Sequence, residues 1–87
     1  MYVILVYDIG EERVGKMLKL CRQYLNWIQN SVFEGEITAV KLEALKLSAQ
    51  AIMEEDHDSL IIFKSRNARW LEKEIIGQDR NELGNIL

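Results

Sequence analysis

The stretch YVILVYDIG, residues 2–10, begins with an apolar run that ends at Asp8. Most of its residues are β-branched or aromatic and do not alternate with polar ones, which is typical of a strand covered on both faces and central in its sheet. The run is far too short to cross a membrane and has no basic segment before it, so we expect neither a transmembrane helix nor a signal peptide. A carboxylate in that place either caps the following helix or takes part in chemistry.

The length of 87 residues suits one small domain over residues 1–87, with residues 72–87 as a C-terminal extension that packs on a partner subunit. A core of this size buries about 60 to 65% of the surface of the unfolded chain, so oligomerisation would add stability. The sequence holds one cysteine and one histidine, which predicts neither an internal disulfide nor a zinc-type ligand cluster. We expect a cytoplasmic protein.

The basic residues are unevenly distributed, although the net charge is −3. One group falls within residues 10–25 and a second within residues 64–73. A lysine or arginine that neutralises a phosphate adds salt-dependent affinity for a polynucleotide, and a solvated helix surface explains the same pattern equally well. The candidate nucleic-acid contacts are Arg13, Lys16, Lys19, Arg22, Arg66 and Arg69.

The hydrophobic periodicity predicts strand, helix, β segment, helix and strand in that order. The first helix runs from Glu11 to about Leu25. Residues 26–38 form either one bent strand or a tight hairpin that turns near Asn30 and Ser31, with a bulge at Gly35. A second helix, capped by Thr38, ends near residue 55, and residues 60–63 form another short buried strand.

This order of elements predicts an α+β fold, the ferredoxin-like βαββαβ sandwich with both helices on one face of the sheet. The other face then needs cover, and no sequence is left for a second helical layer. A homodimer that pairs sheet with sheet is the economical solution. The segment EIIG, residues 74–77, would add a C-terminal strand to the partner's sheet edge.

The motifs YDIG (residues 7–10) and WIQNSVFEGEIT (residues 27–38), together with Arg13, resemble the Cas-two family of CRISPR-associated endoribonucleases. The string QNSVFEG, residues 29–35, is the most distinctive part, and the resemblance spans essentially the whole chain. It implies a ferredoxin-like homodimer that takes part in acquiring new CRISPR spacers. In that role the dimer bridges two dimers of the Cas-one integrase around double-stranded protospacer DNA.

The resemblance also implies a nuclease. Several family members act as Mg²⁺-dependent nucleases on single-stranded RNA or double-stranded DNA, and the strand-one aspartates of the two subunits hold the metal. Asp8 is then the catalytic and metal-binding residue, with Mg²⁺ or another divalent cation as cofactor. Where many members carry further Asp or basic residues, this sequence has Gly10, Glu11 and Trp27.

Two other interpretations stay open. The spacing of Asp8 and Glu11 fits a D-x-x-E box that caps the first helix and stabilises it by about 1 kcal/mol without any chemistry. The same fold also suits a toxin-like, metal-dependent endoribonuclease that is unrelated to spacer acquisition.

Overall fold

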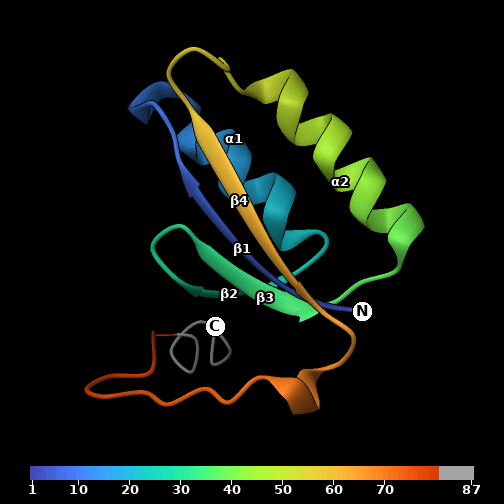
Figure 1. Ribbon diagram of the computed structural model, residues 1–87. Coiled ribbons are helices and arrows are strands. Elements are labelled where there is room, and N and C mark those ends of the chain that lie inside the picture. The colour runs from blue at the N-terminus through green and yellow to red at the C-terminus, as the bar shows by residue number, and fades with distance from the viewer. Residues whose placement is uncertain (81–87) are drawn as a thin grey trace.

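The computed structural model of the protein describes residues 1–80. Its elements are β1 (Tyr2–Asp8), α1 (Glu11–Arg22), β2 (Asn26–Gln29), β3 (Val32–Glu36), α2 (Ala39–Ile52), β4 (Ser59–Ser65) and a 3-10 helix at Ala68–Trp70. The four strands form one antiparallel sheet in the order β2-β3-β1-β4, as Figure 1 shows. This is the predicted ferredoxin-like α+β sandwich, with β1 at its centre.

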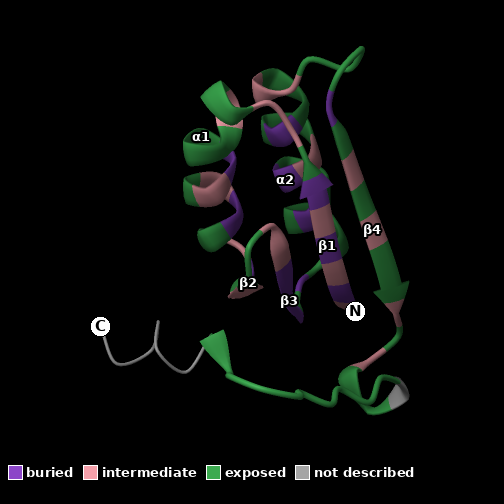
Figure 2. Ribbon diagram, turned by 90° about the vertical axis from the view of Figure 1, so that its left-hand side faces the viewer, coloured by how far each residue is buried: buried purple, intermediate pink, exposed green. Residues whose placement is uncertain are grey.

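The core lies between one face of the sheet and the two helices. Alternate residues of β1 point into it and are buried, while the residues between them are half-buried (Figure 2). On β3, Phe33 is fully buried, and its ring stacks on that of Tyr7 with centroids 6.1 Å apart. The helices contribute five buried residues to this cluster: Met17, Cys21, Leu42, Leu45 and Ala49.

The opposite face of the sheet has no helical cover. On the edge strand β4, Leu60 and Ile62 pack against the core, whereas Ile61 and Phe63 on the open face are 51% and 59% exposed. The prediction of a buried strand at residues 60–63 is therefore wrong for one face. The reason is that an unbroken apolar run carries no information about which of its two faces meets a neighbour.

β2 and β3 form a hairpin, one of the two predicted alternatives. Its turn lies at Asn30, which adopts a left-handed backbone (φ 45°) that asparagine tolerates better than most residues. The Trp27 side chain donates from Nε1 to the Asn30 carbonyl at 3.0 Å. The irregular register falls between Trp27 and Gln29 of β2, so the prediction of a bulge at Gly35 of β3 is wrong.

Both helices are shorter than predicted at their C-termini. α1 ends at Arg22 and α2 at Ile52. The predicted cap of α2 is confirmed, because Thr38 Oγ1 accepts a hydrogen bond from the Lys41 N–H at 3.2 Å. Among the described residues, no helix is long and apolar enough to cross a membrane.

The described part of the C-terminal segment runs along the open side of the sheet (Figure 1). A groove of about 610 Å³ separates residues 68–78 from the open face of β1, β2 and β3. Glu34 is held there by Lys73, which donates to Oε2, and by the Tyr2 hydroxyl, which donates to Oε1 at 2.6 Å. Residues 71–80 form no strand within the chain, so the additional C-terminal strand on a partner's edge stays a prediction, and the end of the extension at 72–87 lies outside the described residues.

Candidate functional site

Asp8 is the last residue of β1 and pairs with Ser59 of β4. The alternation along β1 places it on the open face with Ile4 and Val6, away from the helices. Its side chain is exposed, and within residues 1–80 no group donates a hydrogen bond to its carboxylate or forms an ion pair with it. Both carboxylate oxygens are therefore available to a ligand.

A shallow hollow lies beside the Asp8 carboxylate, with a volume of about 340 Å³. The turn of the β2–β3 hairpin forms its other side, because the Tyr7 N–H donates to the Ser31 carbonyl at 3.2 Å. The sequence analysis identified the QNSVFEG string as distinctive but did not place it beside Asp8. The residues of a turn do not indicate which strand end lies next to that turn in the fold. The lining residues are Tyr7, Asp8, Ile9, Val14, Asn30 and Ser31.

The interpretation of Asp8 as a helix cap is wrong. The N-cap of α1 is Gly10, in extended backbone, and no side chain makes the capping hydrogen bond. Asp8 still belongs to the β1–β4 ladder, which fixes its side-chain direction three residues before the helix begins at Glu11. The start of the helix therefore leaves the Asp8 carboxylate unused.

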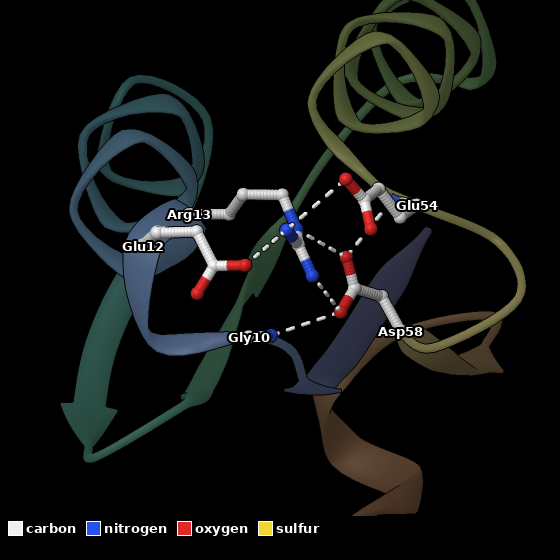
Figure 3. Close-up of polar contacts among 5 residues, drawn as sticks. All are labelled: Gly10, Glu12, Arg13, Glu54 and Asp58. Carbon is white, nitrogen blue, oxygen red and sulfur yellow. Dashed lines mark hydrogen bonds and ion pairs between the residues drawn. The ribbon is translucent and has the colours of Figure 1, made fainter.

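A buried carboxylate, that of Asp58, lies beside Gly10 of the β1–α1 loop (Figure 3). It accepts two hydrogen bonds from the Arg13 guanidinium, from Nε to Oδ2 at 2.7 Å and from Nη2 to Oδ1 at 2.9 Å. Two backbone N–H groups complete its environment, that of Gly10 at 2.9 Å and that of Glu54 at 2.8 Å. One side chain thus joins the β1–α1 loop, the first turn of α1 and the segment that follows α2.

The Arg13 guanidinium is surrounded by carboxylates. Besides its fork to Asp58, its Nη1 lies 2.6 Å from Glu12 Oε1 and 3.5 Å from Glu54 Oε1. Hydrogen bonding to Arg13 holds the pKa of the Asp58 carboxyl well below its usual range, and the same bonds raise the pKa of Arg13. The guanidinium packs so closely that a Cβ on Gly10 would lie 2.4 Å from Nη2.

The basic residues of α1 do not share one face. Steps of three residues drift by about 60° around an α-helix, so Arg13 and Arg22 end on nearly opposite sides. Arg13 faces the loop before β4, whereas Arg22 lies over the Trp27 ring, 5.8 Å from its centroid. Lys16, Lys19 and Arg22 are exposed. The phosphate contact of Arg13 stays a prediction, and its carboxylate partners favour a structural role.

The second basic group lies far from Asp8. Asp8 pairs with Ser59 at the start of β4, whereas Arg66 and Arg69 follow its last residue, which pairs with Tyr2. Seven residues of extended chain separate the two ends by about 20 Å. Arg66 and Arg69 are both exposed, but one chain alone does not bring them to the hollow.

The chemistry of Asp8 fits one ligand of a shared metal site. Within residues 1–80, no three His, Cys, Asp or Glu side chains come together as a site that could hold a metal ion. Mg²⁺ is commonly bound by one or two carboxylates, with water and substrate phosphate oxygens as its other ligands. An exposed carboxylate without a protein partner meets the requirement for one such ligand, and the hollow beside it leaves space for the others.

Comparison with known proteins identifies the family. Residues 1–73 match the family described as CRISPR associated protein Cas2. The chain is 46% identical over 87 residues to the CRISPR-associated endoribonuclease Cas2 of Dictyoglomus turgidum and 44% identical over 87 residues to that of Pyrococcus furiosus, and each match covers 100% of both chains.

Solved structures agree with the sequence relationship. A crystal structure of Cas2 matches with a TM-score of 0.84 and 41% identity, over 92% of this chain and 90% of that one. The structure of Streptococcus pyogenes Cas2 at pH 6.5 matches with a TM-score of 0.73 and 29% identity, over 85% of this chain and 99% of that one. The resemblance of the sequence motifs is thereby confirmed, and the chain belongs to the CRISPR-associated Cas2 family.

Proposed function

We propose that this protein acts in CRISPR spacer acquisition as a symmetric homodimer that holds protospacer DNA together with the Cas-one integrase. The observation that carries the proposal is the open face of the sheet, where Ile61 and Phe63 remain more than half exposed. An apolar face of this kind is stabilised by burial against another surface, and self-pairing about a two-fold axis buries it on both copies at once.

Exposed basic residues support binding to a polynucleotide. The net charge of −3 does not favour general attraction to nucleic acid, so binding depends on local groups. The exposed residues Lys16, Lys19 and Arg22 lie on α1, and a dimer presents them twice. Each phosphate contact adds affinity that falls as the salt concentration rises.

The Asp8 carboxylate favours a second activity, Mg²⁺-dependent hydrolysis of phosphodiester bonds in single-stranded RNA or double-stranded DNA. Asp8 lies on the same open face as Ile61 and Phe63, so in the proposed sheet-to-sheet dimer both Asp8 carboxylates face the pairing surface. In this proposal the two carboxylates hold a divalent cation between them, while Asn30 and Ser31 border the space for a phosphate. When bound, Mg²⁺ polarises the phosphate and lowers the pKa of a bound water molecule. The printed name of the relatives, endoribonuclease, supports RNA as one substrate.

One experiment separates the architectural role from the hydrolytic one. Wild type, Phe63→Asp and Asp8→Ala are compared in light scattering, nuclease and spacer-integration assays. We expect Phe63→Asp to be monomeric and inactive in integration, because a charge on the paired face opposes its burial. We expect Asp8→Ala to stay dimeric and support integration while losing cleavage in Mg²⁺.

The matched control is Leu47→Asp, which places the same charge at an apolar residue, 66% exposed, on the outer side of α2. This variant should behave as wild type in all three assays. A dimeric Phe63→Asp protein with normal integration would contradict the proposed role of the open face. Two results together would favour the toxin-like endoribonuclease instead. The wild-type protein would cleave in a way that depends on Asp8, and it would not support spacer integration with any integrase partner.

A further inference from the structure

The Asp58 carboxylate is placed to fix the backbone that carries Asp8. Asp8 pairs with Ser59, the residue that follows Asp58. Two residues beyond Asp8, the Gly10 N–H donates to Asp58 Oδ1 at 2.9 Å. The segment from residue 8 to residue 10 is therefore held at one end by the β1–β4 ladder and at the other by Asp58.

Arg13 completes this arrangement from the helix side (Figure 3). Its planar fork reaches both oxygens of Asp58, which defines the orientation of the carboxylate better than a single bond would. Its own backbone N–H donates to the Gly10 carbonyl at 2.9 Å. The ion pair between Arg13 and Asp58 thus connects the start of α1, the β1–α1 loop and the residue just before β4.

Neither partner of this ion pair borders the hollow at Asp8. The Asp58 side chain has no exposed surface, and that of Arg13 is 13% exposed. A cation or phosphate at Asp8 therefore touches neither of them directly. Any influence they have on such a ligand passes through the position of Asp8.

We propose that Arg13 and Asp58 are positioning residues for Asp8, whose ion pair sets the direction from which the Asp8 carboxylate meets a divalent cation. This inference rests on the proposed metal role of Asp8 and deepens it. Replacement of a residue that orients a metal ligand without itself binding the metal typically lowers metal affinity or activity by about 10- to 100-fold.

The test uses Mn²⁺ as the probe and follows paramagnetic broadening of the amide signals of residues 8–10. Asp58→Asn keeps the size of the side chain but places an NH₂ group among groups that are all donors. We expect its folded form to bind Mn²⁺ at these residues at least about tenfold more weakly than wild type. Glu54→Gln is the control with the same change of charge, because that side chain is 60% exposed and lies 3.5 Å from Arg13.

Arg13→Lys is the second variant, since it keeps the charge but loses the fork. It should weaken Mn²⁺ binding in the same direction, and it tests the proposal if Asp58→Asn does not fold. In an Asp8→Ala background, Asp58→Asn should still lower the melting temperature but cause no further loss of Mn²⁺ broadening. A purely structural role lowers the melting temperature without changing the Mn²⁺ affinity of the folded protein, and that result in either variant overturns the proposal.

Failure of the proposed metal role has a different signature. If Asp8→Ala retains the broadening, Asp8 is not a ligand, and hydrogen exchange at the Gly10 amide then decides whether Asp58 orders this loop. Exchange at least about tenfold faster in folded Asp58→Asn than in Glu54→Gln supports the ordering by Asp58. Equal protection of Gly10 in the two variants overturns it.

Discussion

Asp8 pairs with Ser59, the residue that follows Asp58, yet the carboxylates of Asp8 and Asp58 have opposite environments. Asp58 is buried and accepts hydrogen bonds from Arg13 and from two backbone N–H groups. Asp8 is exposed, and within residues 1–80 nothing donates to its carboxylate. A fully satisfied carboxylate gives rigidity, whereas one without protein partners is available to a ligand, which is the role proposed for Asp8.

The buried ion pair predicts a loss of stability in acid. Hydrogen bonding to Arg13 depresses the pKa of Asp58 in the folded protein, so the unfolded chain takes up the proton first as the pH falls. The stabilisation is fully present above the ordinary aspartate pKa of about 3.9 and is lost as the pH falls below it. Thermal unfolding followed by circular dichroism from neutral pH to strong acid should show a steep decline for wild type and a flatter one for Asp58→Asn.

The control for this acid dependence is Glu54→Gln, which should keep the steep decline of the wild type because Asp58 remains ionised beside Arg13. Equal slopes for wild type and Asp58→Asn would mean that the ion pair contributes nothing to the acid dependence.

Two glycines of the same region should respond to alanine in opposite ways. Gly10→Ala places a methyl group 2.4 Å from Arg13 Nη2, and the fork to Asp58 prevents that group from moving aside without loss of hydrogen bonds. Gly15 lies within α1, and apart from the helix's own nearby backbone a Cβ there meets nothing within 4 Å. We expect Gly15→Ala to raise the free energy of unfolding by about 0.5 to 1 kcal/mol and Gly10→Ala to lower it. Urea denaturation of the two variants measures both changes, and a stabilised Gly10→Ala would contradict the locked position of Arg13.

The thiol of Cys21 should be inert in the folded protein. Cys21, on α1, is fully buried in the core, and burial raises the pKa of its thiol to about 12. Because the thiolate is the reactive form, an aromatic disulfide reagent should modify Cys21 only as fast as the protein unfolds. Ser48→Cys adds an exposed thiol on α2 and should react at once under the same conditions. Fast modification of wild type under native conditions would place Cys21 outside the core.

The Tyr2 hydroxyl should make the protein sensitive to alkali. Its burial, followed by its hydrogen bond to Glu34, raises the pKa of Tyr2 to about 12. A raised pKa in the folded state means that this stabilisation is present below the ordinary tyrosine pKa of about 10 and is lost as the pH rises through 12. Tyr2→Phe should flatten the dependence of unfolding on pH in this range, whereas Tyr24→Phe should retain it. Tyrosinate absorbance gives a direct measurement of the titration.

The local elements were predictable because each has a local cause. The Thr38 cap, the turn at Asn30 and the central position of β1 follow from residue types and spacing within a few positions of the chain. The partnership of Arg13 with Asp58 spans 45 positions, and no local pattern indicates it. Residues 54–57 of the acidic turn are exposed, as the sequence suggests, and only the tertiary fold distinguishes Asp58 from them.

The open face of the sheet was predictable only in outline. The count of elements left one face without cover, which is what the structure has. Which residues of β4 lie on that face depended on the register with β1, where Ile61 pairs with Val6 and Phe63 with Ile4. A shift of one residue would have exchanged the two faces, so the composition of the strand alone could not assign them.

The C-terminal segment should be dispensable for the fold and required for spacer acquisition. Residues 71–80 are all exposed, and several of them line the groove beside the sheet. Ile75 and Ile76 are 43% and 95% exposed. None of them belongs to the core cluster, so deletion of residues 75–87 should leave the circular dichroism spectrum nearly unchanged. Two adjacent exposed isoleucines are stabilised by burial against a partner, so the truncated protein should lose spacer integration with the Cas-one integrase. Replacing both isoleucines by serine in the full chain should cause the same loss, and unaltered integration by both proteins would contradict the assignment of this segment to a partner.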